Sequence, residues 1–160
     1  MTELQQYCTF WIQGSLYGVE VEQVQEVIRH QGMTLVPLAP QAVAGLINLR
    51  GQIVTAIDLR RRLGVAERAA EELPMNVVVR TGEGAVSLLV DEIDDVIEVE
   101  RPEMQPPPGS LDEASSLLLR GVYKLKHQLL LVLNTDVAVD IAVTEPDGES
   151  NEARSTAAYA

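Results

Sequence analysis

Few residues in this chain could carry out catalysis or hold a metal ion. The sequence contains one cysteine, Cys8, and two histidines, His30 and His127. They are far apart in the sequence, so they form neither a nucleophile and base pair nor the closely spaced ligand pairs of a zinc site. The glycines in residues 82–84 lack the later glycine and the helix start of a phosphate-binding loop. We therefore expect no catalytic residue, no metal site and no cofactor.

The acidic run at residues 91–95 is a further candidate for chemistry, because adjacent aspartates can hold Mg²⁺. Proteins that use such a site alternate strands with long helices and carry a lysine downstream, and this sequence lacks that pattern. We expect the acidic side chains to face solvent and the apolar side chains to face inward, namely Ile93, Val96 and Ile97. The enzymatic alternative is a small hydrolase whose activity depends on Asp91, Asp94 and Asp95.

Arginines are concentrated between residues 50 and 62 of this acidic chain. Those at residues 60–62 form either a solvated helical face or a docking patch for an acidic partner. Arg50 differs, because it lies between an apolar strand and Gly51, where its guanidinium could be partly buried and would need an anion. Glu26 is the candidate anion, and the sequence predicts a salt bridge between Glu26 and Arg50.

Composition excludes several classes of protein. The chain has 160 residues, with 24 acidic and 12 basic side chains and a formal charge of −12. This charge repels a phosphate backbone, so we expect no nucleic-acid partner. No apolar run approaches the roughly 18 residues of a membrane span, and no signal-peptide pattern is present, so we expect no membrane insertion. A single cysteine cannot form an intrachain disulfide, which favours the cytoplasm.

The pattern of apolar residues predicts short strands with few helices. Residues 7–13 and 16–19 flank Gly14 and Ser15, which is typical of a β-hairpin. From Val21, apolar residues recur at helical spacing as far as Ile28, which predicts a short amphipathic helix. Further strands are expected at residues 46–50, 52–57, 76–80 and 86–90. A basic helical turn is expected at residues 59–63, between Asp58 and Gly64.

The two halves of the chain repeat one pattern. A shift of about 69 residues aligns residues 24–28 with 93–97, and a shift of about 76 aligns residues 45–50 with 121–126. Each half has enough short strands for a small barrel. The sequence therefore predicts a mainly β fold of two small barrels in residues 7–140, with approximate halves 7–73 and 74–140. Residues 144–160 are expected to form a disordered acidic tail.

Four segments resemble the CheW-like family of scaffold proteins in bacterial chemotaxis. They are residues 17–28, 45–60, 88–96 and 121–125, and with the strands around them they cover roughly residues 7–140. The motif Asn48-Leu49-Arg50-Gly51 is highly specific in its strand context. The resemblance implies two SH3-like five-stranded β-barrels side by side, with short helices, and no enzymatic activity.

The resemblance also implies partners and a binding site. Family members link the cytoplasmic signalling tips of chemoreceptors to the regulatory domain of a chemotaxis histidine kinase, so we expect a cytoplasmic protein that is recruited to receptor arrays. Carried over by position, the receptor-binding groove between the barrels would contain Val24, Glu26, Gly45, Asn48, Arg50, Leu89 and Val90. The family's acidic and basic pair corresponds to Glu26 and Arg50, and no kinase-binding residues are assigned. The alternative is a small-molecule-binding double β-barrel that uses the groove between the barrels as its pocket.

Three segments leave alternatives open. The turn of the second half is Lys126-His127-Gln128 instead of an acidic or Asn residue followed by Gly, so its geometry is not predicted. Residues 136–143 are rich in β-branched side chains and could form either a helix or a strand. Residues 106–109, with the sequence Pro-Pro-Pro-Gly, predict a rigid extended connection that is either an inert loop or a recognition segment.

Overall fold

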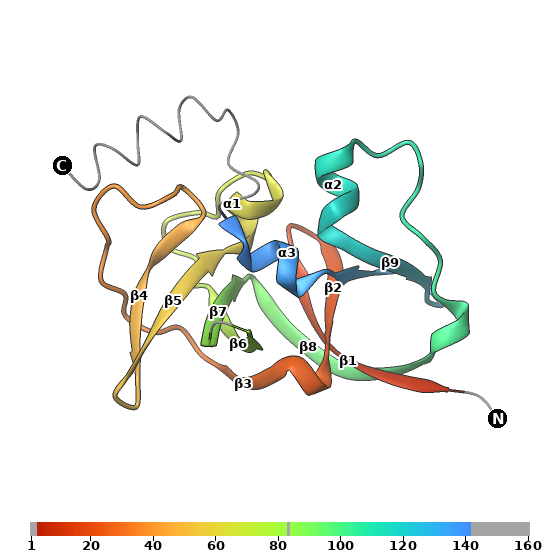
Figure 1. Ribbon diagram of the computed structural model, residues 1–160, viewed down its shortest axis with the longest axis horizontal. Coiled ribbons are helices and arrows are strands. Elements are labelled where there is room, and N and C mark those ends of the chain that lie inside the picture. Colours follow the sequence, from red (N-terminus) through yellow and green to blue (C-terminus); the bar gives the residue numbers. More distant parts are fainter. Residues whose placement is uncertain (1–2, 83, 142–160) are drawn as a thin grey trace.

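The protein is mainly β, with two five-stranded sheets and a few short helices (Figure 1). The structure is a computed structural model that describes residues 3–82 and 84–141. Sheet A contains, in spatial order, β8 (Glu92–Glu100), β1 (Leu4–Ile12), β2 (Ser15–Glu20), β10 (Leu129–Leu133) and β9 (Leu119–Lys124). Sheet B contains β3 (Val24–Ile28), β6 (Met75–Thr81), β7 (Gly84–Val90), β5 (Gln52–Asp58) and β4 (Val43–Leu49). The short helices are η1 (Val21–Gln23), α1 (Leu59–Leu63), η2 (Arg101–Glu103), α2 (Glu113–Leu118) and α3 (Thr135–Val139).

The internal repeat predicted from the sequence is confirmed by the strand order. In sheet A, β2 of the antiparallel hairpin β1–β2 pairs in parallel with β10, the second strand of the later hairpin β9–β10. In sheet B, β7 of the antiparallel hairpin β6–β7 pairs in parallel with β5, the second strand of the earlier hairpin β4–β5. The equivalent helices α1 and α3 begin in the same way. The side chain of Asp58 accepts a hydrogen bond from the backbone N–H of Arg60, and that of Asn134 accepts one from Val137. These caps satisfy backbone donors that the first helical turn leaves free.

The sheets do not coincide with the two halves of the repeat. β3 follows the β1–β2 hairpin in sequence but pairs with β6, and β8 follows the β6–β7 hairpin but pairs with β1. Each sheet therefore takes its outer strand from the chain that leaves the other sheet's hairpin. This exchange ties the two sheets together along the middle of the molecule (Figure 1).

Apolar side chains form three clusters. The central core draws residues from both sheets and all three α-helices, including Phe10, Leu88, Leu118 and Leu133. A separate sheet A core consists of side chains from that sheet alone, namely Tyr7, Leu16, Tyr123, Leu130 and Val132. The sheet B core consists of Ile47, Leu49, Val54, Ala56, Val78 and Leu89. Alternate side chains of a strand point to opposite faces of its sheet, which lets each sheet serve its own core and the shared one.

The helix predicted from Val21 is wrong. Only Val21–Gln23 is helical, as the 3-10 turn η1, and Val24–Ile28 is the strand β3. The repeat residues 93–97 likewise belong to strand β8, where Ile93 and Ile97 are half-buried but Val96 is 54% exposed. Valine and isoleucine are stiff at their first side-chain torsion and favour extended backbone, and here pairing with a neighbouring strand overrides the helical spacing.

Two segments of the second half whose structure the sequence did not decide, residues 126–128 and 136–143, are described by the structure at least in part. The backbone N–H of Leu125 donates to the carbonyl of Gln128 at 2.8 Å, which closes the β9–β10 hairpin without a glycine. Thr135–Val139 is the helix α3, so the start of the 136–143 segment is helical and not extended. Residues 144–160, predicted to be a disordered tail, lie outside the described residues. None of the helices in residues 3–82 and 84–141 is long and apolar enough to cross a membrane.

Candidate functional site

The β4–β5 turn presents Arg50 at the tip of a tight hairpin. Leu49 pairs with Gln52 across the strands, which leaves Arg50 and Gly51 as a two-residue loop. Both loop residues have positive φ, +51° for Arg50 and +89° for Gly51, as hairpin turns of this kind require. The side-chain oxygen of Asn48 accepts a hydrogen bond from the Gly51 N–H at 2.8 Å. The turn is therefore fixed by Asn48 and Gly51.

Arg50 is an unusual residue for the conformation that it adopts. A non-glycine residue in the left-handed region costs on the order of 1 kcal/mol, and such residues cluster at functional sites. Glycine or asparagine would fit this position with less strain. Placing a guanidinium at the tip of the turn therefore lowers the stability of the turn. This cost favours a role for the Arg50 side chain outside the turn itself.

Arg50 and Glu26 form an ion pair across the two edges of sheet B. The guanidinium donates to a carboxylate oxygen of Glu26, which lies on β3, whereas Arg50 follows β4. β3 and β4 are the first and last strands of the sheet, so sheet B curls until its edges approach at this point. The Arg50 side chain is 70% exposed and that of Glu26 is 20% exposed. The expectation that the Arg50 guanidinium is partly buried is wrong, because the turn tip projects beyond the strands.

The exposed part of the predicted groove is smaller than the sequence indicated. Asn48 is exposed and Val24 is half-buried against the central core. Leu89 and Val90 are 2% and 0% exposed, so the prediction that they line a groove is wrong. They lie in the central strand region of sheet B, where their side chains fill the sheet B core and the central core.

Gly45 has a structural role beneath this surface. It is buried, and a Cβ atom at this position would lie 2.7 Å from the backbone oxygen of Thr34. Thr34 and Leu46 exchange backbone hydrogen bonds of 2.9 and 2.8 Å. Gly45 therefore allows the segment after β3 to lie directly against β4. The equivalent Gly121 has the same close approach, with the backbone oxygen of Gln105 at 2.7 Å from its would-be Cβ.

Sequence reasoning missed one exposed apolar residue of this surface. Ile53 is 64% exposed on β5 and lies directly opposite Asn48 in the β4–β5 register. Its neighbour Val54 is fully buried, so the alternation of strand faces places Ile53 on the outside. The signal was present in the sequence as an isoleucine two residues after the turn. An exposed isoleucine beside an exposed arginine is a combination that protein interfaces use.

Two of the three α1 arginines, Arg60 and Arg62, make internal contacts, whereas Arg61 is exposed, as expected for a solvated helical face. Arg60 donates to Asp91 through Nε at 2.8 Å and Nη2 at 2.6 Å. Arg61 pairs with Glu67 at 2.7 Å. Arg62 donates to the backbone oxygens of Val137 and Ala138 at the end of α3, at 2.7 and 3.0 Å. These contacts join α1 to the β7–β8 connection and to α3.

Asp91 is the centre of a largely buried charge network. Its carboxylate accepts hydrogen bonds from Arg60, from Arg68 at 3.0 Å and from the backbone N–H of Gln13 at 2.8 Å. Burial by itself would raise the pKa of Asp91, but the hydrogen bonds from Arg60, Gln13 and Arg68 outweigh it and lower the pKa to about 2. The prediction that the acids of this run all face solvent is wrong for Asp91, which is 18% exposed.

Among the described residues we find neither a cluster that could bind a metal ion nor a reactive thiol. No group of three or more His, Cys, Asp or Glu side chains in residues 3–82 and 84–141 could hold a metal ion. Cys8 is 7% exposed, and burial raises the pKa of its thiol. A buried, protonated thiol is a poor nucleophile.

Comparison with known proteins gives a consistent result. The family model described as "CheW-like domain" matches residues 6–142. A chemotaxis protein CheW of Bacillus subtilis is 28% identical over 131 residues, covering 82% of this chain and 84% of the relative. The chemotaxis protein CheW of Rhizobium meliloti is 30% identical over 122 residues, covering 75% and 77%. The crystal structure of the scaffolding protein TtCheW from Thermoanaerobacter tengcongensis superimposes with a TM-score of 0.74 at 26% identity, covering 83% of this chain and 89% of that chain.

Proposed function

Because this chain belongs to the CheW-like domain family, we propose that it is a non-enzymatic adaptor of bacterial chemotaxis. In this proposal it couples the cytoplasmic tips of chemoreceptors to the regulatory domain of a chemotaxis histidine kinase. The observation that carries the proposal is the family match over residues 6–142, supported by the fold shared with a scaffolding protein. An adaptor needs two binding surfaces and no reactive constellation, which agrees with the site described above.

The receptor would bind at the surface formed by Glu26, Asn48 and Arg50, with Val24 at its base. A guanidinium carries five N–H donors in a planar fork. In this proposal Glu26 holds the Arg50 guanidinium in place while its other donors face the receptor, and Ile53 supplies apolar contact beside it. Gly45 supports the surface by letting residues around Thr34 pack on β4.

The same proposal extends to architecture and location. Each sheet would act as an SH3-like barrel, a description favoured in sheet B by the contact between its two edges through Glu26 and Arg50. The protein would be cytoplasmic and would reach receptor arrays by binding its partners. These statements follow from family membership together with the proposed binding surfaces.

Calorimetric titration tests the receptor surface. The pure protein is titrated with a chemoreceptor signalling fragment and, separately, with the kinase regulatory domain from the same genome. Arg50→Glu would place two acidic side chains in contact at the turn and should weaken receptor binding at least tenfold. Arg120→Glu makes the same charge change at an exposed position of β9 in sheet A and serves as the control. Wild-type receptor affinity in Arg50→Glu would contradict the site assignment.

A further inference from the structure

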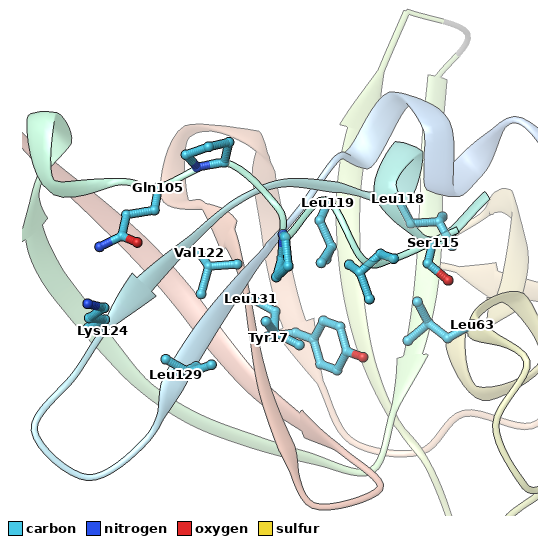
Figure 2. A pocket seen from close by; sticks show the side chains of 13 residues that line it. Tyr17, Leu63, Gln105, Ser115, Leu118, Leu119, Val122, Lys124, Leu129 and Leu131 are labelled. Carbon is cyan, nitrogen blue, oxygen red and sulfur yellow. The ribbon is translucent and has the colours of Figure 1, made fainter. Parts of the chain in front are cut away.

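A cavity lies on sheet A, away from the Arg50 turn. Its volume is about 420 Å³, and it is bounded by β2, β9, β10 and α2, by the proline-rich segment before α2, and by one residue of α1 (Figure 2). Most of its lining comes from sheet A and the segment next to it, and Leu63 of α1, which follows β5 of sheet B, also contributes. Cavities of about 300 to 1,000 Å³ are the usual size of small-molecule sites.

The walls of the cavity are apolar and largely preformed. Leu129 and Leu131 of β10 line it, as do Pro106, Pro108 and Leu111 of the segment before α2. Proline fixes its backbone torsion, so a proline-lined wall loses little freedom when a ligand enters. The Tyr17 ring forms an inner wall and is stacked on Phe10 of the central core, with ring centres 6.4 Å apart and planes 10° apart.

The fold leaves apolar surface exposed at this cavity. Leu129 is 53% exposed and Leu111 is 38% exposed, and both line the cavity. Contact with an apolar ligand would remove this surface from water, which is favourable in proportion to the area covered. The interior is thus suited to a hydrocarbon chain or ring.

The cationic group of the cavity lies at one end, and the Tyr17 hydroxyl lies nearer the middle. Figure 2 shows Lys124 and Gln105 at one end and Ser115 and Leu63 at the other, with Tyr17 and Leu131 between them. Lys124 and Lys126 are the two lysines of the whole chain, which has a formal charge of −12. Neither lysine makes an ion pair with the part of the chain that the structure describes. An unpaired ammonium at the mouth of an apolar cavity is complementary to an anion.

We propose that this cavity binds a single-chain amphipathic carboxylate. Its hydrocarbon chain lies between the proline segment and the leucines of β10, and its carboxylate pairs with Lys124 at the mouth. The elongated arrangement, with the charged group at one end and apolar walls along the middle, matches a medium-chain carboxylic acid. This site is separate from the proposed receptor surface and does not depend on the proposed function.

Titration calorimetry with decanoate, below the concentration at which it forms micelles, tests the proposal. We expect saturable binding at one site, and binding at least tenfold weaker for decyltrimethylammonium, which has the same chain and the opposite charge. Equal affinity for the two amphiphiles would show adsorption to exposed apolar surface and would overturn the proposal. Absence of decanoate binding at millimolar concentration would also overturn it.

Two variants locate the site. Lys124→Glu should weaken decanoate binding at least tenfold, whereas Lys126→Glu, the same change on the same hairpin but outside the cavity, should change it less than threefold. Ser115→Trp fills the cavity from an exposed position of α2 and should abolish binding while leaving the melting temperature of the free protein unchanged. Unaltered decanoate affinity in Ser115→Trp would overturn the proposal. The proposal would also be overturned if the wild type did not bind decanoate and Ser115→Trp lost binding of the kinase domain. The cavity would then be a docking pocket for a protein.

Discussion

Substitution of Asp91 by asparagine should destabilise the protein strongly and in a way that depends on pH. Asp91 lies between β7 and β8, where the chain passes from sheet B to sheet A. Its carboxylate pairs with Arg60 and Arg68, whose side chains are 11% and 10% exposed. Asparagine keeps the shape of the side chain but removes the charge, which leaves Arg60 without its anionic partner. Arg68 keeps its second contact, with Asp58 at 3.1 Å.

The expected loss of unfolding free energy in Asp91→Asn follows from the pKa of Asp91, which is lowered from 3.8 to about 2. At about 1.4 kcal/mol for each unit of pKa, this corresponds to roughly 2.5 kcal/mol of stability at neutral pH. Removing one partner from a buried ion pair typically costs about 3 to 5 kcal/mol. Because Arg68 retains Asp58, we expect Asp91→Asn to lower the free energy of unfolding by about 2 to 4 kcal/mol.

The sign of the pH dependence is fixed by the direction of the shift. A carboxylate with a lowered pKa stabilises the folded protein above its ordinary pKa, and this contribution is lost as the pH falls through its folded value. The contribution of Asp91 is therefore complete above about pH 5 and declines toward pH 2. The difference in stability between the wild type and Asp91→Asn should shrink over the same range, because a protonated aspartate resembles an asparagine.

Urea unfolding at a series of pH values measures this prediction. Asp95→Asn is the matched control, since Asp95 lies in the same acidic run and is exposed. It should change the free energy of unfolding by less than about 0.5 kcal/mol. If Asp91→Asn unfolded at the same urea concentration as Asp95→Asn at pH 7, the ion pairs of Asp91 would contribute little to stability and the reasoning would be refuted.

Three further predictions concern single residues. Arg50→Glu should change the free energy of unfolding by less than about 1 kcal/mol in a calorimetric melt, because the ion pair is largely exposed, and a loss above about 2 kcal/mol would show that Arg50 is structural. Gly45→Ala should destabilise the protein by about 1 to 3 kcal/mol, since its Cβ would lie 2.7 Å from the Thr34 oxygen, and the wild-type melting temperature in this variant would refute the close approach. Cys8 should react with a thiol reagent at least tenfold more slowly in the native protein than in urea, and equal rates would contradict its burial.

Local chemistry made parts of the fold predictable. The turn at Arg50-Gly51, the helix between Asp58 and Gly64 and the repeat between the two halves each depend on residues that are close in sequence. Asp58 caps α1 and Gly64, with φ of +72°, ends it, as their types indicate. Glu26 and Arg50 were paired on the expectation that the Arg50 guanidinium is partly buried, and the structure brings the two side chains together although that of Arg50 is 70% exposed.

Contacts between residues far apart in the chain could not be predicted from the sequence. The valines and isoleucines of β3 and β8 have spacing that suits a helix, and only the neighbouring strands β6 and β1 make them extended. Arg60 looked available because its partner Asp91 lies 31 residues beyond it, and Arg62 because its acceptor Val137 lies 75 residues beyond it. Helix α2, capped by Asp112, follows the proline-rich segment and was not predicted at all. The cavity depends on how that segment folds back over sheet A, which no local pattern reveals.

We propose that this protein joins a chemoreceptor to a histidine kinase. Co-sedimentation tests it most directly, with receptor signalling fragments anchored on vesicles, the kinase from the same genome, and this protein added or omitted. We predict that the kinase sediments with the vesicles only when the protein is present, and that it fails to do so with Arg50→Glu. Sedimentation of the kinase to the same extent with and without the protein would contradict the adaptor function.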